Sequence, residues 1–349
     1  MKQIFLSIVI PAYNESKTLY KNIIEVDKWV KQKKKISFEI LIVNDGSTDN
    51  TGQILNKAKS QIKNLKVIHH VANFGRGKAI RTGLGHALGK YIICLDADLS
   101  YDPEHISLLL QPLINNIADI TLASAHHPKG RIINVPFGRR MLSKFGNKLL
   151  SLGFEKKIFT STCSVRGFKK EVIENLELMS DDKDLHLEVI QKAQLLGYKI
   201  KEIPSILNWR DKKRRVPEKH GKVSNLKTLR MKNTILSHLV FNYVSNPGIL
   251  LIIPIILFLL TSITGLSLLI SNFLIKLQNT NDSILSIIRS TLIDGQITAG
   301  VTFFSLITLI IFIIFYFLSF QNKYNFDLTY KLLMRMNARI KKIEQNRKL

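Results

Sequence analysis

Short apolar runs that stop at turn or acidic residues recur along the first hundred residues of the chain. The runs cover residues 4–10, 38–43, 65–69 and 91–95. Runs of this length and composition are typical of buried parallel strands. The segments between them, such as residues 16–31, have apolar residues three or four positions apart, which is the spacing of an amphipathic helix. This alternation of strand and helix predicts a doubly wound α/β sheet.

Carboxylates follow three of these apolar runs. Glu15 comes after the first run, Asp45 after the second, and Asp96 and Asp98 after the fourth. Because ligands bind beyond the carboxyl ends of the strands in open α/β sheets, we expect the four side chains to lie together. Two carboxylates separated by one residue can hold a hard divalent cation, Mg²⁺ or Mn²⁺, against a diphosphate. The pattern indicates a nucleotide-sugar site.

The last third of the chain has a different pattern. Residues 247–270 and 299–320 contain no charged side chain. A helix of either length exceeds the hydrocarbon core of a bilayer, which is about 30 Å thick. A pair of buried helices in a soluble domain is the alternative, but such helices normally show a polar face. The two stretches therefore predict a transmembrane helical hairpin.

Charge changes this picture in one respect, because it gives the hairpin an orientation. The formal net charge is +25, with ten Lys/Arg in residues 210–232 and a second basic cluster after residue 320, whereas residues 271–298 hold two Lys/Arg and two Asp. The positive-inside rule then places both termini and the α/β domain in the cytoplasm. We expect an anionic membrane as partner. Nucleic acid is disfavoured, since the basic residues flank the membrane segments.

These patterns divide the chain into six parts. They are an α/β domain (1–209), a basic amphipathic juxtamembrane segment (210–245), a first span (247–270), an extracytoplasmic connector (271–298), a second span (299–320) and a basic cytoplasmic tail (321–349). The expected location is the cytoplasmic (inner) membrane, crossed more than once. Apolar residues between 333 and 343 have coiled-coil-like spacing, a pattern compatible with a homo-oligomer.

Four motifs in the α/β region resemble those of a known family. They read Pro11-Ala-Tyr-Asn-Glu15, Asn44-Asp-Gly-Ser-Thr-Asp49, Asn73-Phe-Gly-Arg-Gly-Lys-Ala79 and Asp96-Ala-Asp-Leu-Ser100. In this order and spacing they resemble family 2 glycosyltransferases of the GT-A fold. The nearest likeness is to the polyprenyl-phosphate sugar synthases of the dolichyl-phosphate mannose synthase group. The resemblance covers about residues 4–215.

The resemblance implies a role for each donor-side residue. Pro11, Tyr13 and Glu15 would line the nucleoside pocket, and Asp45 would accept a hydrogen bond from the base. Asp96 and Asp98 would hold Mg²⁺ or Mn²⁺ on the diphosphate, with Asp98 essential to catalysis. For Asp45 and Asp49, turn and helix-cap chemistry is the alternative.

The glycine-rich segment that begins at Asn73 needs a separate interpretation. A dinucleotide-binding loop requires G-x-G-x-x-G after the first strand, but Ile80 stands where the third glycine belongs. Binding of NAD is therefore disfavoured. We assign Lys78 to the nucleotide-sugar site, and it and Arg81 would either reach phosphate groups or form a solvated helix face.

The acceptor side departs more from the family. Arg139 and Ser143 resemble the segment that holds the lipid phosphate, and their i, i+4 spacing places them on one helix face. A second family arginine would fall on Ala125, and Arg131 or His126 would replace it. Residues 160–166 also differ from the motif that the family has at this position. Glu188 matches an inward-facing helix of the family, with a surface carboxylate as the alternative.

Together these observations predict a membrane-anchored, inverting, metal-dependent glycosyltransferase. It would move a sugar from a UDP- or GDP-sugar to a polyprenyl or dolichyl phosphate on the cytoplasmic face, with Asp98 and Arg139 as catalytic residues. One alternative is a family 2 transferase with another membrane or polysaccharide acceptor. The other is a non-catalytic membrane-anchored scaffold. A processive polysaccharide synthase is disfavoured, because no Gln-x-x-Arg-Trp motif is present around Trp209.

Overall fold

A computed structural model describes residues 4–33, 36–151, 154, 156, 158–210, 247–280 and 282–347. The chain divides into two compact units, Met1–Phe241 with Lys331–Leu349, and Asn242–Tyr330. Apart from Arg210, the predicted juxtamembrane segment 210–245 lies outside the described residues.

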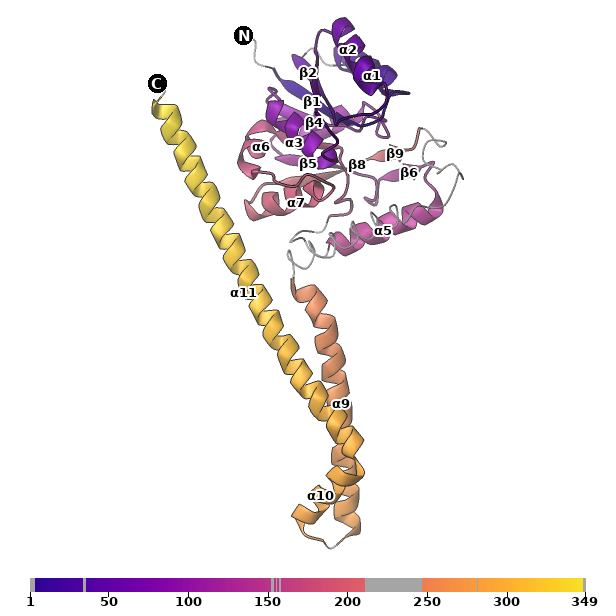
Figure 1. The fold of residues 1–349 in the computed structure, drawn as a ribbon, viewed down its shortest axis with the longest axis vertical. Helices are drawn as coiled ribbons and strands as arrows, with labels where there is room; N and C mark the ends of the chain where they lie inside the picture. The colour runs from indigo at the N-terminus through magenta and orange to yellow at the C-terminus, as the bar shows by residue number, and fades with distance from the viewer. Residues whose placement is uncertain are drawn as a thin grey trace. The chain divides into compact units, whose positions relative to one another are not determined.

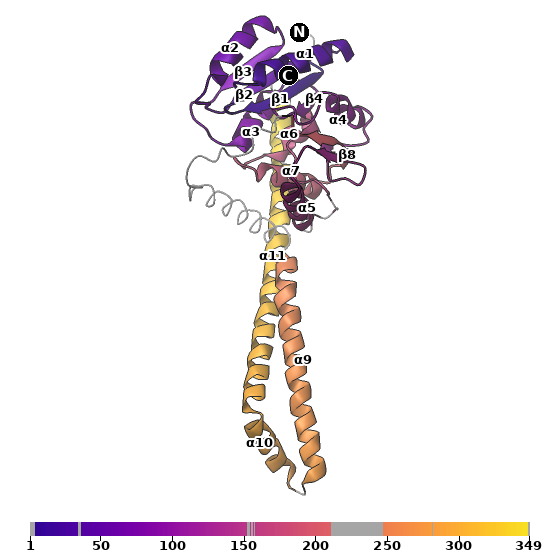
Figure 2. The same ribbon diagram turned by 90° about the vertical axis from the view of Figure 1, so that its right-hand side faces the viewer.

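A seven-stranded sheet in the order β3-β2-β1-β4-β7-β5-β8 forms the centre of the first unit (Figures 1 and 2). The strands are β1 (Leu6–Ala12), β2 (Phe38–Asn44), β3 (Leu65–His69), β4 (Tyr91–Cys94), β5 (Ile120–Ser124), β7 (Arg166–Lys169) and β8 (Ile200–Pro204). Strands β1 to β4 are mutually parallel, and β5 is parallel to β8. β7 runs antiparallel to both of its neighbours, β4 and β5. The predicted α/β sheet is thus confirmed, and β5, the antiparallel β7 and β8 are additions to the four predicted strands.

Helices cover both faces of this sheet. They are α1 (Leu19–Lys33), α2 (Thr51–Gln61), α3 (Arg76–His86), α4 (His105–Ile114), α5 (Phe137–Ser151), α6 (Lys170–Leu176) and α7 (Leu185–Leu195). Alternate residues of β1 point to opposite faces: Ile8 and Ile10 pack with α1, α2 and α4, whereas Val9 packs with α3 and α7. Both faces of β1 are buried, which is why its sequence is a continuous apolar run rather than an alternating one.

β1 extends two residues beyond the predicted end. Past Val9 the strand pairs with β2 alone, through the register Pro11↔Val43 and Ala12↔Asn44. Proline has no N–H to donate to a ladder and is tolerated where a strand has an open edge. Pro11 therefore lies inside β1 and not in the turn that follows it.

A second, two-stranded sheet adjoins the carboxyl ends of the central strands. β6 (Arg131–Ile133) pairs in parallel with β9 (Ile206–Asn208). The backbone N–H of Asn208 donates to the carbonyl of Ser100 over 2.8 Å. This small sheet is thereby joined to the turn that follows β4.

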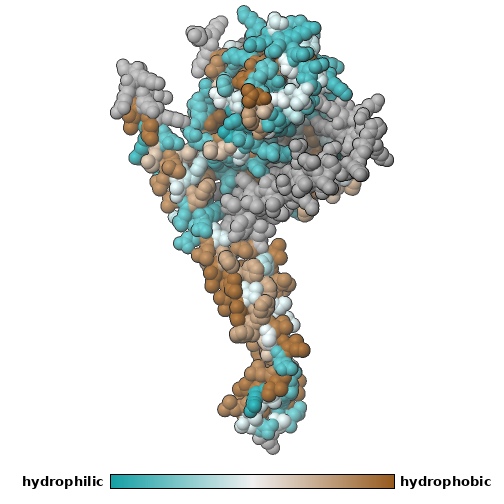
Figure 3. Space-filling model, in the orientation of Figure 1, coloured by the Kyte–Doolittle hydropathy of each residue, from teal (hydrophilic) through white to brown (hydrophobic). Residues whose placement is uncertain are grey.

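The second unit is helical, with α9 (Pro247–Asn279), α10 (Ile284–Asp294) and the first part of α11 (Gln296–Arg347). By length and composition, Leu251–Asn279 and Gln296–Asn337 could each cross a membrane. Figure 3 shows the apolar surface of this unit. Both helices are longer than the predicted spans, so much of 271–298 is helical and the tail from residue 321 is helical as far as Arg347.

Small and hydroxylated side chains join α9 to α11. The hydroxyls of Ser262 and Ser305 are buried and lie 2.8 Å apart. A Cβ atom on Gly265 would lie 2.0 Å from Oγ1 of Thr302. Close helix contact at small residues, with hydrogen bonds between hydroxyl groups, is how apolar helices pair within a bilayer.

Candidate active site

A cavity of about 450 Å³ opens beyond the carboxyl ends of β1, β2 and β4. Its lining consists of Pro11, Ala12, Tyr13, Glu15, Asp45, Asn73, Arg76, Ala79, Asp96, Ala97, Asp98, Ser100, Leu207 and Trp209. The predicted donor-side residues Pro11, Tyr13, Glu15, Asp45, Asp96 and Asp98 all belong to this set. Of the other predicted site residues, Lys78, Arg131, Arg139 and Ser143 do not line it.

The turn after β4 places Asp96 and Asp98 in this cavity. Its shape depends on Leu99, a buried residue with the positive φ of 45°. Such a conformation costs free energy for a residue other than glycine and persists only where its surroundings impose it. Asn22 Nδ2 donates to the carbonyl of Ala97 over 2.7 Å, and the N–H of Ser100 donates to Asp98 Oδ1 over 3.0 Å.

Asp96 is held by two residues that the sequence did not single out. Ser164 Oγ donates to Asp96 Oδ1 over 2.5 Å, and the guanidinium of Arg76 forms an ion pair with the same oxygen. Arg76 also contacts Ser164, at 3.1 Å. Arg76 stands inside the glycine-rich motif, so its position was a usable signal, whereas Ser164 reaches the site only because β7 folds back beside β4.

The donor set at this turn suits a hard divalent cation. Within the described ranges, no group of three or more His, Cys, Asp or Glu could hold a metal ion. The carboxylates of Asp96 and Asp98 could supply two oxygen ligands, with the remaining ligands coming from a diphosphate and water. Mg²⁺ is commonly bound in this way, by one or two carboxylates together with substrate phosphates.

Asp45 has a structural role in addition to its place in the cavity wall. It is 3% exposed and accepts hydrogen bonds from the backbone N–H groups of Phe74 and Gly75, each at 3.0 Å. His70 Nδ1 lies 2.8 Å from the same carboxylate. These contacts fix the loop that leads into α3. The predicted hydrogen bond from Asp45 to a base stays a prediction.

Asp49 shows the turn chemistry that was its alternative interpretation. It accepts from the N–H of Thr51, the first residue of α2, over 3.0 Å and from the N–H of Ser16 over 3.3 Å. Burial raises the pKa of Asp49, but the hydrogen bonds from Thr51 and Ser16 outweigh it and lower the pKa to about 2.

Beyond Arg76, two basic residues of α3, Lys78 and Arg81, do not line the cavity. Arg81 pairs with Asp181 over 2.6 Å and also donates to the carbonyl of Met179. The N–H of Lys78 donates to the carbonyl of Asp181 over 2.9 Å. Arg81 is thus a structural residue, and a phosphate contact by Lys78 stays a prediction.

Glu188 on α7 organises the same loop from the other side. Its buried carboxylate accepts from the N–H groups of Met179 and Ser180, each at 2.9 Å, and pairs with Lys192 over 2.7 Å. Burial raises the pKa of Glu188, while Lys192 and the two backbone donors lower it, and the net shift is downward. Glu188 is inward-facing, and the surface alternative was wrong.

The predicted acceptor residues lie on α5, beside the cavity wall. The guanidinium of Arg139 lies over the ring of Trp209, 5.4 Å from its centroid, and Trp209 lines the cavity. Ser143 Oγ lies 2.9 Å from His126 Nε2. Burial lowers the pKa of His126, and the positive charges of Lys144 and Arg140 lower it further. Arg131, on β6, is exposed.

The segment 160–166, which differs from the family motif, ends at Arg166, whose positively charged side chain is buried. Arg166 is 2% exposed and donates to the carbonyls of Ser161, Cys163 and His186 at 2.6 to 2.8 Å. Burial lowers the pKa of Arg166 to about 10, so it remains charged at neutral pH. Arg166 therefore fixes the loop that carries Ser164, rather than binding a ligand.

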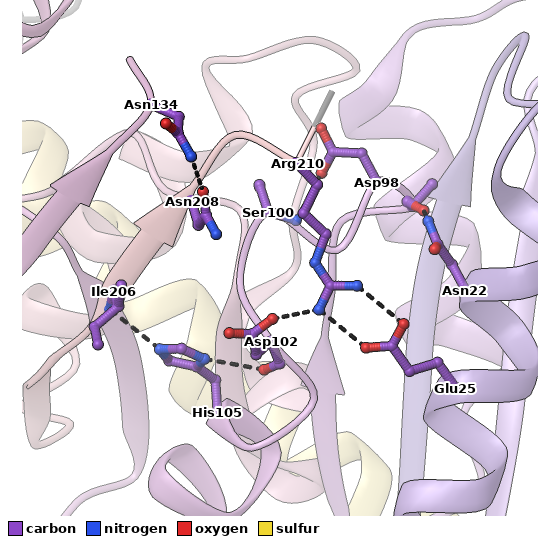
Figure 4. A network of polar contacts seen from close by, with 11 residues as sticks. Asn22, Glu25, Asp98, Ser100, Asp102, His105, Asn134, Ile206, Asn208 and Arg210 are labelled. Atoms are coloured by element: carbon purple, nitrogen blue, oxygen red, sulfur yellow. Dashed lines mark hydrogen bonds and ion pairs between the residues drawn. The ribbon is translucent and has the colours of Figure 1, made fainter. Parts of the chain in front are cut away.

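One wall of the cavity contains Trp209. The residues on either side of Trp209 in the chain belong to a polar network at the end of the α/β domain (Figure 4). Arg210 forms a bidentate pair with Glu25, both contacts at 2.9 Å, and a further ion pair with Asp102. The N–H of Ile206 donates to His105 Nε2 over 3.2 Å. These contacts hold β9 and Trp209 against α1 and α4.

Comparison with known proteins identifies the family. Residues 7–177 match the model for glycosyl transferase family 2. The chain is 30% identical over 202 residues to the dolichol-phosphate mannosyltransferase of Pyrococcus furiosus, covering 57% of this chain and 55% of that protein. It is 29% identical over 215 residues to a dolichyl-phosphate beta-glucosyltransferase of Trichomonas vaginalis, covering 58% of this chain and 65% of that protein. The chain thus spans less than two thirds of either relative.

A solved structure supports the fold. Glucosyl-3-phosphoglycerate synthase from Mycobacterium tuberculosis superposes with a TM-score of 0.50 at 14% sequence identity, over 68% of this chain and 80% of that one. Likeness at this identity concerns the fold alone, and it agrees with the GT-A prediction. Together with the family model, these matches show that residues 7–177 form a glycosyltransferase family 2 region.

Proposed function

We propose that this chain is a membrane-anchored, inverting glycosyltransferase that moves a sugar from a UDP- or GDP-sugar to a polyprenyl or dolichyl phosphate. The observation that carries the proposal is one cavity that joins the Asp96/Asp98 pair to Trp209, against which Arg139 of α5 packs. Relatives named as dolichol-phosphate mannosyltransferase and dolichyl-phosphate beta-glucosyltransferase support the lipid-phosphate acceptor.

The donor half of the cavity matches a nucleoside diphosphate. Tyr13 is 43% exposed at the rim, where its ring can stack on a base. Pro11 and Glu15 would complete the nucleoside wall. Asp96 and Asp98 would hold Mg²⁺ or Mn²⁺, which neutralises charge on the leaving diphosphate. Arg76 is placed to contribute a second positive charge to that diphosphate.

The acceptor side of the site would provide positive charge for the phosphate group that acts as the nucleophile. Arginine binds phosphate oxygens in a fork geometry, and Arg139 would hold the acceptor with Ser143 and, from β6, Arg131. An acceptor oxygen attacks the anomeric carbon, and the bond from that carbon to the β-phosphate oxygen breaks. The nucleoside diphosphate leaves with the electron pair, and the anomeric configuration inverts. A phosphate monoester, with a second pKa near 6, is already anionic and needs no strong base.

The apolar helices of the second unit and the distribution of charge support a membrane location. Two helices that could cross a membrane would anchor the chain. The excess of Lys/Arg on both outer flanks favours a cytoplasmic α/β domain, cytoplasmic termini and an anionic inner leaflet.

The test uses full-length protein in liposomes that contain polyprenyl phosphate, with labelled UDP- and GDP-sugars offered one at a time. We expect one donor to give a labelled, extractable lipid, and EDTA to abolish the product. If one nucleotide binds by calorimetry but no lipid is labelled, the acceptor assignment is wrong and another membrane or polysaccharide acceptor takes its place. If neither binding nor transfer is found, the chain is a scaffold.

A further inference from the structure

Helix α5 has one face fixed to the α/β domain. Asn147 is 3% exposed, and its Oδ1 accepts from the hydroxyls of Ser161 and Thr162 at 3.0 and 3.3 Å. Leu150, on the same side, is buried in the core beside α3 and α6. These contacts fix which side of α5 points outward.

The outward face carries large apolar side chains. Phe137 is 75% exposed, Leu142 and Phe145 are each 66% exposed, and Met141 is 48% exposed. At 3.6 residues per turn these four side chains share an arc of about 140°, on the side of the helix opposite Asn147. Four large apolar groups on one exposed helix face are unusual for a surface that faces only water.

Basic residues border this apolar face, and α5 contains no acidic residue. Arg140, Lys144 and Lys148 lie along one edge, whereas Arg139 lies beyond the other edge and turns inward onto Trp209. A helix with bulky apolar groups beside a row of Lys/Arg is typical of a helix that lies in the headgroup region of an anionic bilayer. The long basic side chains can extend to the headgroups while their stems stay among apolar groups. A protein partner would not require a border of one sign.

We propose that α5 is a membrane-surface helix, whose apolar face enters the outer part of an anionic leaflet while its other face holds the cavity wall. The inference rests on the proposed membrane association and not on sugar transfer. It deepens the proposed function, because Arg139 contacts Trp209 and Ser143 contacts His126 on the inner side of the same helix. An acceptor phosphate at headgroup level would thus meet α5 without leaving the membrane.

The test places an environment-sensitive fluorophore (NBD) on a cysteine introduced as Phe145→Cys in the full chain. Cys94 and Cys163 are buried, and burial raises the pKa of both thiols, so the wild-type protein should take up little label. In vesicles with anionic lipid and lipid-borne quenchers, we expect blue-shifted emission and strong quenching. Lys57→Cys on exposed α2 is the aqueous control, and Leu266→Cys in α9 is the inserted control.

Each other outcome overturns the proposal in a different way. A water-like signal at residue 145 with quenching at residue 266 means that α5 is not at the membrane although the chain is anchored. Loss of quenching at both positions means that membrane association is itself wrong. A blue shift at residue 145 without quenching means that protein, such as a second copy, covers the face.

Charge reversal tests the lipid preference. Lys144→Glu with Lys148→Glu should reduce quenching at residue 145 in anionic vesicles and have little effect in neutral ones. The matched control is Lys57→Glu with Lys59→Glu on α2, where both lysines are exposed. An equal loss from both pairs would show that only net charge matters, which would overturn the assignment to α5.

Discussion

Two carboxylates on one turn, Asp96 and Asp98, carry most of the proposed chemistry. Their turn includes the strained residue Leu99 and is fixed on both sides, by Asn22 bonding Ala97 and by Asn208 bonding Ser100. Strain that the surroundings impose in this way pre-organises a site before ligand binds. Binding of the nucleotide-sugar is therefore not needed to bring the two carboxylates into position.

The first prediction concerns Asp98. Asp98→Asn keeps the size of the side chain but removes the charge that would hold the cation. We expect a loss of kcat on the order of 10²–10³-fold, as for removal of one electrostatic contact to a developing charge. Glu104→Gln, at an exposed carboxylate before α4, is the control and should retain activity. Normal turnover by Asp98→Asn would refute the metal assignment.

The second prediction separates acceptor from donor. Arg139→Ala should raise the KM for the lipid phosphate about 10- to 100-fold, because a charge-assisted hydrogen bond contributes about 1.5–3 kcal/mol. The KM for the nucleotide-sugar should stay unchanged. In the family, a second arginine would stand at the position of Ala125. The same measurement on Arg131→Ala decides whether Arg131 takes the place of that arginine. An equal rise in both KM values for Arg139→Ala would make Arg139 a residue of the cavity wall only.

The sequence predicted some of these residues for a physical reason. Parallel strands end at one edge, so Glu15, Asp45, Asp96 and Asp98 had to meet there once the strands were recognised. Ser164 precedes β7 and Trp209 follows β9, and the pairing of these two strands depends on long-range packing that no local pattern encodes. Arg76 was not singled out although Lys78 of the same motif was, because a helix start gives no indication of which side chain turns toward the strand ends.

Among the elements, β7 is one of the strands that the apolar pattern did not reveal. It is four residues long and has Gly167 at its centre, so neither length nor apolar character marked it. A Cβ atom on Gly167 would lie 2.4 Å from Thr121 Oγ1 and 2.8 Å from Ile93 Cδ1. Glycine is therefore required for β7 to fit between β4 and β5.

This gives the third prediction. Gly167→Ala should lower the free energy of unfolding by about 1–3 kcal/mol, as overpacking of a filled core does. Gly85→Ala is the contrast, since nothing lies within 4 Å of its added Cβ in α3. There, alanine should raise stability by about 0.5–1 kcal/mol. Thermal unfolding in detergent measures both, and an unchanged Gly167→Ala protein would mean that β7 is less tightly packed than described.

The fourth prediction concerns Glu188 and its loop. Glu188→Gln should cost about 1.5–3 kcal/mol of stability near neutral pH, the range for hydrogen bonds to a charged group. The pKa of Glu188 is lowered below its ordinary 4.5, so its contribution is present above that pH and is lost as the pH falls through the lowered value. The difference between the wild type and Glu188→Gln should therefore shrink in acid.

Its control has the same helical spacing but more solvent. Glu174 pairs with Lys170 at 3.8 Å, and its side chain is 58% exposed. Glu174→Gln should change stability by no more than about 0.5 kcal/mol, because exposed i, i+4 pairs contribute little. If the two variants lose equal stability, the burial of Glu188 is not what stabilises the loop.

At the scale of the whole molecule, the division into an α/β unit and an apolar helical unit follows from composition alone. The uncharged stretches were long enough to predict two spanning helices, and the structure extends both. Helix ends were predicted less well, because polar residues at the ends of a long helix continue it as readily as they stop it. Side chains at Leu333, Met336, Ile340 and Ile343 remain exposed, so the homo-oligomer stays a prediction.

The measurement that tests the central claim most directly is the identity of the bond formed. Protein in liposomes would be supplied with the donor it prefers and with polyprenyl phosphate, and the lipid product would be examined by phosphorus and proton NMR. The account predicts a phosphodiester in which the lipid phosphate carries the sugar through its anomeric carbon, with the configuration inverted relative to the donor. A lipid phosphate that remains a monoester while the sugar appears on another acceptor, or a retained configuration, would contradict it.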